Sequence, residues 1–253
     1  MHVLGLIPAR LASERLARKP LQLLAGEPLI VQVARRVVEL DVCDRVAIAT
    51  DAPEIREAVE KAGFEAVMTA ESHRSGTERV AEAMAGPDFA DYEIVLNVQG
   101  DEPFVDEAAI GGAIGRVRQG DPIGTAAGPL AADEAADPNR VKVVIDQHGH
   151  AAYFSRAAIP HLRDPEADAD ARVEHLQHVG VYAYTREALE RWVALPPVPE
   201  ERAERLEQLR PLLHGIPIGV ARCAEPPARG IDTLSDLAWA EAEIARRRGE
   251  REP

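Results

Sequence analysis

The first half of the chain alternates short apolar runs with helical patterns, and this alternation limits the fold more than any other feature. Strands that alternate with helices pair into a mostly parallel sheet with helices on its faces. The spacing predicts strands over 3–8, 45–50, 65–69, 94–98 and 123–129, and helices over 28–40, 53–62, the segment after 76, and 106–120. We therefore expect an α/β fold with a Rossmann-like sheet.

The pattern changes after residue 130. Strand-like runs at 141–145, 151–154 and 179–184 are separated by a turn at 147–149 and a charged loop at 164–172, which predicts antiparallel additions and a smaller subdomain. Prolines at 196–199 precede an expected helix over 204–213, followed by a strand over 216–221 and a closing helix over 233–247.

Composition bounds the class of protein. With 253 residues, 46% of them hydrophobic, the chain can bury the core of one large domain, and no apolar stretch approaches the length of a membrane span. Cys43 and Cys223 lack metal-ligand spacing, which argues against a zinc site or a disulfide framework and favours buried free thiols. We expect a cytoplasmic protein without membrane insertion.

The charges are unevenly distributed. The chain has a net charge of −14, yet a loop after the first strand carries Arg10, Arg15, Arg18 and Lys19 against Glu14 alone. We expect no nucleic-acid binding, because it needs many cations spread over a surface. The loop is either a site for a local anionic ligand or a solvated basic loop. The glycine patterns GxxxxGK[ST] and GxGxxG are missing, which argues against a P-loop or a dinucleotide fold.

Two aspartates follow strand ends, where ligands bind in open α/β sheets. Asp101 lies in the turn after the strand at 94–98, and Asp232 lies just before the closing helix. Either carboxylate could hold magnesium, which takes one or two carboxylates together with phosphate and water. The alternatives are a turn aspartate for Asp101 and, for Asp232 or Thr233, a helix cap that Asp236 completes.

Other polar residues allow a functional and a structural interpretation. Ser75, Gly76 and Arg79 open a helix after a strand, where backbone amides and a guanidinium could grip a nucleotide, although helix capping alone explains Ser75. His178, Tyr182 and Tyr184 share one strand face. Three further polar residues lie near predicted element ends: Arg156, Glu207 and Gln208.

Seven segments occur in the order typical of one enzyme family: IPARLASERLARKPL, HRSGTERV, NVQGDEP, YFSRAAIP, HVGVYAY, LEQLR and RGIDT. Together they resemble the 3-deoxy-manno-octulosonate cytidylyltransferases, or CMP-Kdo synthetases, over nearly the whole chain. NVQGDEP and HRSGTER carry most of the resemblance, whereas the opening segment is shared with many sugar nucleotidyltransferases.

The resemblance implies a fold and a reaction. It implies one GT-A-like nucleotidyltransferase domain over 1–253, with 130–215 as a sugar-binding and dimerisation subdomain, and a homodimer. The implied reaction joins CTP and Kdo, with Mg²⁺, to give CMP-Kdo and pyrophosphate for lipopolysaccharide precursors.

The resemblance also implies roles for particular residues. Arg10, Arg15 and Lys19 would hold the triphosphate, and Asp101 and Asp232 the metal. The cytidine or its phosphates would contact Ala9, Ser75, Gly76, Arg79 and Gln99. The sugar acid would contact Arg156, His178, Tyr182, Glu207 and Gln208, with Arg156 facing its carboxylate.

The chain departs from the family in its opening loop. Glu14 stands where the family commonly has serine or threonine, and Ala17 and Arg18 stand where it commonly has Pro-Gly. Three alternatives remain: a cytidylyltransferase for an amino-Kdo variant or a sialic acid, a glycosyltransferase, and a nucleotide-binding protein without turnover. The glycosyltransferase is disfavoured because Asp101-Glu102-Pro103 lacks the Asp-x-Asp pattern.

Overall fold

The computed structural model describes residues 1–12, 15–163 and 174–249. The chain divides into two compact units, the first formed by His2–Asp106 and Ala228–Pro253, and the second by Met1 and Glu107–Pro227. The predicted subdomain at 130–215 lies inside the second unit, which is wider than the prediction.

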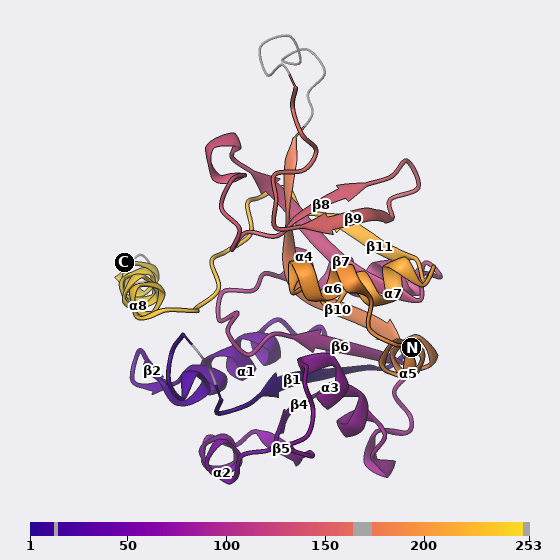
Figure 1. Ribbon diagram of the computed structural model, residues 1–253. Helices are drawn as coiled ribbons and strands as arrows, with labels where there is room; N and C mark the ends of the chain where they lie inside the picture. Colours follow the sequence, from indigo (N-terminus) through magenta and orange to yellow (C-terminus); the bar gives the residue numbers. More distant parts are fainter. Residues whose placement is uncertain (13–14, 164–173, 250–253) are drawn as a thin grey trace. The chain divides into compact units, whose positions relative to one another are not determined.

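The first unit is built on parallel strands. Its sheet has the order β6-β1-β4-β5, and all three pairings are parallel. Figure 1 shows its helices arranged around these strands. The elements in chain order are β1 (Val3–Ala9), the 3₁₀ turn η1 (Lys19–Leu21), β2 (Leu23–Leu24), β3 (Glu27–Pro28), α1 (Leu29–Glu39), β4 (Arg45–Thr50), α2 (Pro53–Lys61), β5 (Glu65–Met68), α3 (Gly76–Met84), the 3₁₀ turn η2 (Pro87–Phe89), β6 (Ile94–Val98) and α8 (Leu234–Gly249).

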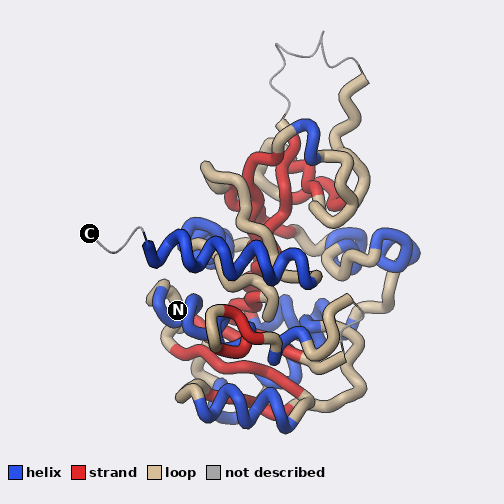
Figure 2. The backbone as a smooth tube through the Cα atoms, turned by 90° about the vertical axis from the view of Figure 1, so that its left-hand side faces the viewer, coloured by secondary structure: helices blue, strands red, loops and turns tan. Residues whose placement is uncertain are grey.

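The core of the first unit explains these elements. Leu4 and Leu6 of β1 and Ile48 of β4 have no exposed surface, because parallel strands are covered on both faces. Helix α1 buries Ile30, Val33 and Val37 at helical spacing. Helix α8 is uninterrupted along its length (Figure 2).

The second unit is mixed. Strand β11 (Ile218–Arg222) pairs parallel with β7 (Ile123–Leu130), and β7 pairs antiparallel with β10 (His175–Thr185). Strands β8 (Lys142–Ile145) and β9 (Ala151–Ser155) form an antiparallel hairpin against β10. The remaining elements are α4 (Glu107–Arg118), the 3₁₀ turn η3 (Ala132–Glu134), α5 (Arg186–Ala194), α6 (Pro199–Glu204) and α7 (Leu209–Leu213). The α/β class with a smaller antiparallel part is therefore confirmed.

Most predicted elements match within one or two residues, but the helix predicted over 204–213 is wrong. Pro199 starts α6 five residues earlier, because proline suits the first turn of a helix. Arg205 then adopts a left-handed conformation with φ 53°, which ends α6 and separates it from α7. Helix α5, capped by Thr185, was not predicted, and β10 begins four residues earlier than expected.

Two expectations concern single features. Cys43 and Cys223 are free, as predicted, although each is only half-buried. Within the described residues, no helix is long and apolar enough to cross a membrane. The charged loop predicted over 164–172 lies outside the described residues.

Candidate functional site

The carboxyl ends of β1 and β6 bring two loops of the first unit together. The strands pair in parallel, so the residues after Ala9 and after Val98 emerge at one edge of the sheet. A Cβ on Gly100 would lie 2.9 Å from the carbonyl oxygen of Pro8 and 3.3 Å from Ile30 Cδ1. Only glycine therefore permits this approach between the β6 turn and the end of β1.

A second contact joins the β6 turn to the segment before α8. The Ile231 amide donates to the Asp101 carbonyl at 2.9 Å. A Cβ on Gly230 would lie 3.2 Å from Glu102 Oε1, so the two segments pack closely. Asp101 and Asp232, far apart in sequence, are thereby brought together.

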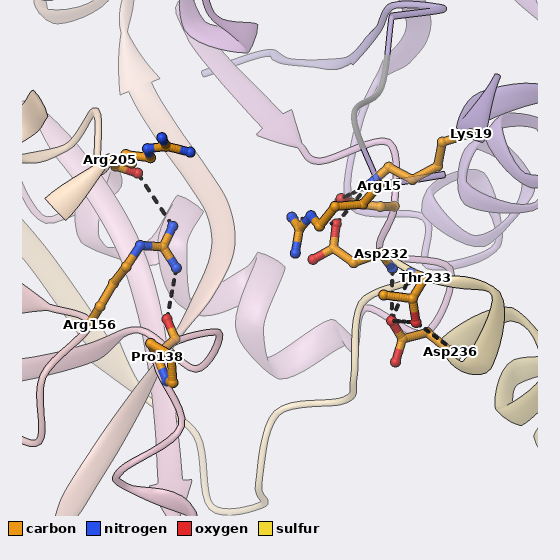
Figure 3. A network of polar contacts seen from close by, with 9 residues as sticks. Arg15, Lys19, Pro138, Arg156, Arg205, Asp232, Thr233 and Asp236 are labelled. Atoms are coloured by element: carbon orange, nitrogen blue, oxygen red, sulfur yellow. Dashed lines mark hydrogen bonds and ion pairs between the residues drawn. The ribbon is translucent and has the colours of Figure 1, made fainter. Parts of the chain in front are cut away.

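The Lys19 ammonium lies between these two carboxylates. Its Nζ donates to Asp101 Oδ2 at 2.5 Å and to Asp232 Oδ1 at 3.0 Å. Burial opposes the charge, but the two carboxylates outweigh it and raise the pKa of Lys19. Arg15 Nη2 also pairs with Asp232 Oδ1 at 2.9 Å, and Figure 3 shows Arg15 directed at the Asp232 side chain.

Thr233 and Asp236 cap the start of α8. The Thr233 hydroxyl accepts from the Asp236 amide at 3.2 Å, and the Asp236 carboxylate accepts from the Thr233 amide at 2.9 Å. This reciprocal pair is a capping box, and it is visible in Figure 3. The Asp232 side chain is therefore not needed as the cap and remains available to cations.

A third carboxylate, Glu102, belongs to the same cluster and was not predicted. Burial raises its pKa to about 8, and Asp101 and Asp232 add to the increase by repulsion. In the sequence, the one signal for Glu102 is its position beside Asp101. Acidic residues in turns are too common for this position to single it out.

The donor set fits a hard divalent cation. In the described part of the chain, no group of three or more histidine, cysteine, aspartate or glutamate residues forms a metal cluster. Two converging carboxylates are nevertheless the number that magnesium uses when phosphate and water complete its shell. The Lys19 ammonium between Asp101 and Asp232 shows that this point attracts a cation.

The rest of the opening loop is only partly described. Ser13 and Glu14 lie outside the described residues. Arg10 is exposed and makes no hydrogen bond or ion pair with a described residue. Arg18 has a left-handed φ of 52° and approaches Glu54 at 3.7 Å, and Ala17 accepts from the Gln22 side chain at 2.7 Å.

The start of α3 lies close to the end of β1. Ser75 caps the helix by accepting from the Glu78 amide at 3.2 Å. A Cβ on Gly76 would lie 3.1 Å from the Pro8 ring and 3.8 Å from Gln99 Oε1. Ser75, Gly76, Gln99 and the buried Ala9 therefore belong to one neighbourhood of the first unit.

The Arg79 side chain is buried and held by other partners than the residues of this neighbourhood. Its side chain is 2% exposed and donates to Asp51 Oδ2 at 2.6 Å and to Thr69 Oγ1 at 2.5 Å. The guanidinium is thus enclosed by partners of its own unit and braces α3 against the ends of β4 and β5. Asp51, its ion-pair partner, was not singled out in the sequence.

In the second unit, Arg156 is held by backbone carbonyls. Its guanidinium donates to the carbonyls of Glu204 at 2.7 Å, Pro138 at 2.8 Å and Arg205 at 3.4 Å, two of which Figure 3 shows. The Glu204 carboxylate accepts from the Arg156 amide at 2.8 Å rather than from its guanidinium. No described carboxylate forms an ion pair with the Arg156 guanidinium, so its charge is not neutralised there.

Lys142 supports Arg156 and was not predicted. Its side chain has no exposed surface, and its Nζ donates to three carbonyls, including that of Arg156 at 2.6 Å. Burial lowers its pKa. With all three hydrogens used in this way, Lys142 is a structural support rather than a candidate ligand.

An aromatic cluster gathers the other predicted sugar-side residues. The His178 and Tyr182 rings lie 5.2 Å apart, and Tyr182 stacks on Tyr184 at 5.9 Å. The Tyr182 hydroxyl is buried without a hydrogen-bond partner among the described residues. Burial raises its pKa well above the usual value, and Tyr184 and Glu207 contribute, so Glu207 acts on the same hydroxyl. Gln208, 6% exposed, directly precedes α7.

Three comparisons identify the relatives of this chain. A family described as Cytidylyltransferase matches residues 4–218. A 3-deoxy-manno-octulosonate cytidylyltransferase of Gemmatimonas aurantiaca is 54% identical over 95% of this chain and 93% of its own length. The enzyme of that name from Yersinia pseudotuberculosis is 44% identical over 94% of this chain and 96% of its own length.

Solved structures agree with these relatives. A CMP:2-keto-3-deoxy-manno-octonic acid synthetase complexed with CTP matches with a TM-score of 0.89 and 36% identity, covering 98% of this chain and all of that one. A 4-diphosphocytidyl-2C-methyl-D-erythritol synthase from Anaerococcus prevotii matches with a TM-score of 0.59 at 16% identity over 97% and 99%, which shows a shared fold. By sequence and by structure, the chain belongs to the cytidylyltransferase family, among the 3-deoxy-manno-octulosonate cytidylyltransferases.

Proposed function

We propose that this protein transfers CMP from CTP to 3-deoxy-D-manno-octulosonate, giving CMP-Kdo and pyrophosphate. The observation that carries the proposal is the convergence of Lys19 and Arg15 on Asp101 and Asp232 at the carboxyl end of the parallel strands. The names of the relatives supply the two substrates and the reaction.

The reaction requires positioning and neutralisation of charge more than proton transfer. The sugar hydroxyl attacks the α-phosphorus while pyrophosphate leaves, so negative charge accumulates on the phosphate oxygens. Arg10, Arg15 and Lys19 would bind those oxygens, and the neighbourhood of Ala9, Ser75, Gly76 and Gln99 would bind the rest of the nucleotide. We assign Arg79 to bracing that neighbourhood, because Asp51 and Thr69 enclose its guanidinium.

Magnesium would be held by Asp101 and Asp232, where it would neutralise phosphate charge and polarise the attacking oxygen. Lys19 would compete with a metal for these carboxylates, because both cations would be attracted to the same two negative charges. A Lys19 side chain released from one carboxylate would be able to bind phosphate.

The sugar acid would be bound by the second unit. Arg156 offers a charge that no described carboxylate neutralises, which suits the carboxylate of an acid sugar. Tyr182 offers an unpaired hydroxyl, and His178, Glu207 and Gln208 offer further polar groups. All of these residues lie within 130–215, which favours this segment as the sugar-binding part.

Three further properties belong to this proposal. Two free cysteines suit a reducing cytoplasm. A product made from Kdo suits lipopolysaccharide precursor synthesis. Among the described strands, β9 forms a ladder only with β8, and His150 just before it bridges to Gly219 of β11; the remaining edge of β9 would form a twofold interface in a homodimer.

Pyrophosphate release tests the reaction directly. The purified protein would be assayed in Mg²⁺ with CTP, UTP, ATP and dTTP, each against Kdo, an amino-Kdo variant and a sialic acid. Release with CTP and Kdo is the expected result. Absence of release with that pair overturns the proposal, and preferential release with a different acid sugar assigns the protein to that substrate. Omission of Mg²⁺ and addition of a chelator test the metal.

A further inference from the structure

Thr125 determines which nitrogen of His178 carries a hydrogen atom. Thr125 has no exposed surface and lies in β7, opposite Tyr182 of β10, where the register between the strands shifts. At this irregularity the Thr125 Oγ1 atom lies 2.6 Å from the Val181 carbonyl oxygen and 2.9 Å from His178 Nε2. It also lies 3.5 Å from the Val179 carbonyl oxygen, so one hydroxyl meets three polar atoms at hydrogen-bonding distance.

The hydrogen count assigns the two shorter contacts, those to Val181 and His178. A threonine hydroxyl has one hydrogen, and a carbonyl oxygen can only accept. The 2.6 Å separation is typical of a short O–H···O bond, so the Thr125 hydroxyl donates to Val181. His178 Nε2 must then carry a hydrogen and donate it to the same oxygen atom.

The other nitrogen is left as an acceptor. In a neutral imidazole with its hydrogen on Nε2, Nδ1 carries a lone pair. Burial lowers the pKa of His178 to about 3, so the ring is neutral near pH 7. No described residue hydrogen-bonds to Nδ1, and the residue keeps part of its surface accessible, while the rings of Phe154 and Tyr182 flank it.

We propose that Thr125 is a positioning residue that holds His178 as the Nε2–H tautomer, so that Nδ1 accepts a hydrogen bond from a hydroxyl group of the bound sugar acid. A carboxylate has no hydrogen to donate to this atom and is disfavoured there. The identity of the ligand rests on the proposed function, whereas the tautomer rests on the geometry of Thr125 alone.

The tautomer is measurable without substrate. We would record two-bond ¹H–¹⁵N spectra of the histidine rings of the full chain at pH 7 and assign His178 by its absence from His178→Gln. The expected signals are those of a neutral ring protonated at Nε2, retained in Thr125→Ser and changed in Thr125→Val. Protonation at Nδ1 in the wild type, or an unchanged ring in Thr125→Val, overturns the proposal.

Kinetics test the acceptor role. We expect Thr125→Val to raise KM for Kdo about tenfold, as loss of an oriented hydrogen bond implies, while KM for CTP stays within about twofold and Thr125→Ser stays close to the wild type. Thr185→Val is the matched control, because it removes a helix-capping hydroxyl in the same unit. Equal effects of the two valine variants would contradict the acceptor role. If the wild type turns over no acid sugar, the proposed function fails, but the spectra still decide the tautomer.

Discussion

Asp101 is one of the two carboxylates whose charge the Lys19 ammonium compensates in the candidate site. We predict that Asp101→Asn lowers turnover by about 100-fold or more, since in the proposed site this carboxylate would hold the cation that neutralises the phosphates. The fold should be retained, because asparagine keeps the size of the side chain. Steady-state kinetics and thermal unfolding measure both effects. Asp91→Asn, at an exposed loop position, is the control. An Asp101→Asn enzyme with more than half of the wild-type turnover would remove Asp101 from the mechanism.

The same geometry predicts competition between Lys19 and a metal ion. Without nucleotide, Lys19→Met should bind Mn²⁺ about tenfold more tightly than the wild type, a gain of ~1.4 kcal/mol, because the internal cation no longer holds the carboxylates. Titration followed by electron paramagnetic resonance measures free Mn²⁺ directly. Lys61→Met, on an exposed face of α2, should leave the affinity unchanged. Weaker binding to Lys19→Met would show that Lys19 does not compete with the metal.

His178 predicts how stability depends on pH. Burial lowers its pKa to about 3 in the folded protein, against ~6.5 in the unfolded chain, so the unfolded state binds more protons between these values. Its contribution is therefore present above pH 6.5 and is lost as pH falls. From pH 6.5 to pH 5 this loss amounts to about 2 kcal/mol in the free energy of unfolding. Urea unfolding at both pH values should show a smaller loss for His178→Gln. Equal losses in the two proteins would refute the shift.

At the scale of elements, the turn after β6 can approach β1 closely because Gly100 has no side chain. Gly100→Ala places a Cβ 2.9 Å from a backbone carbonyl, which cannot move like a side chain. We expect a destabilisation of about 1–3 kcal/mol together with reduced turnover, since Asp101 is displaced. Gly111→Ala is the matched control: no atom lies within 4 Å of the new Cβ inside α4, so stability should rise by about 0.5–1 kcal/mol. Denaturant unfolding compares the two variants, and equal effects would contradict the steric argument.

The elements also show what the sequence could predict. The bounds of β4 and β6 were predicted to the residue, because buried apolar runs end abruptly at polar or turn residues. The break at Arg205 was missed, since arginine carries no signal for a left-handed conformation and the break depends on packing.

The candidate site also contains features that the sequence could predict and features that it could not. Asp101 and Asp232 were predictable from their positions after strands. Their pairing with Lys19 and the support of Arg156 by Lys142 were not predictable, because these contacts join segments distant in sequence or depend on backbone carbonyls.

At the scale of the whole molecule, the proposed homodimer can be tested at the edge of β9 that lies beyond the His150–Gly219 bridge. Sedimentation equilibrium should give twice the 27.4 kDa of one chain. Ala152→Asp adds a charge to an exposed position of this strand and should dissociate the dimer, because an edge with buried charge pairs poorly. Ala108→Asp, exposed on α4, is the control. A monomeric wild type would refute the dimer, and a dimeric Ala152→Asp would refute β9 as its interface.

In sequence, the second unit lies between the two segments of the first unit, and this order decides when contacts of the first unit can form during synthesis. Synthesis on the ribosome proceeds from the N-terminus, so Lys19 and Asp101 emerge before Asp232. The hydrogen bond between Ile231 and Asp101 closes a loop of about 130 residues, and such distant contacts form late. A nascent chain therefore carries its basic loop and Asp101 without Asp232 while the second unit is being made. The two carboxylates can therefore approach each other only after the whole second unit, which lies between them in sequence, has been made.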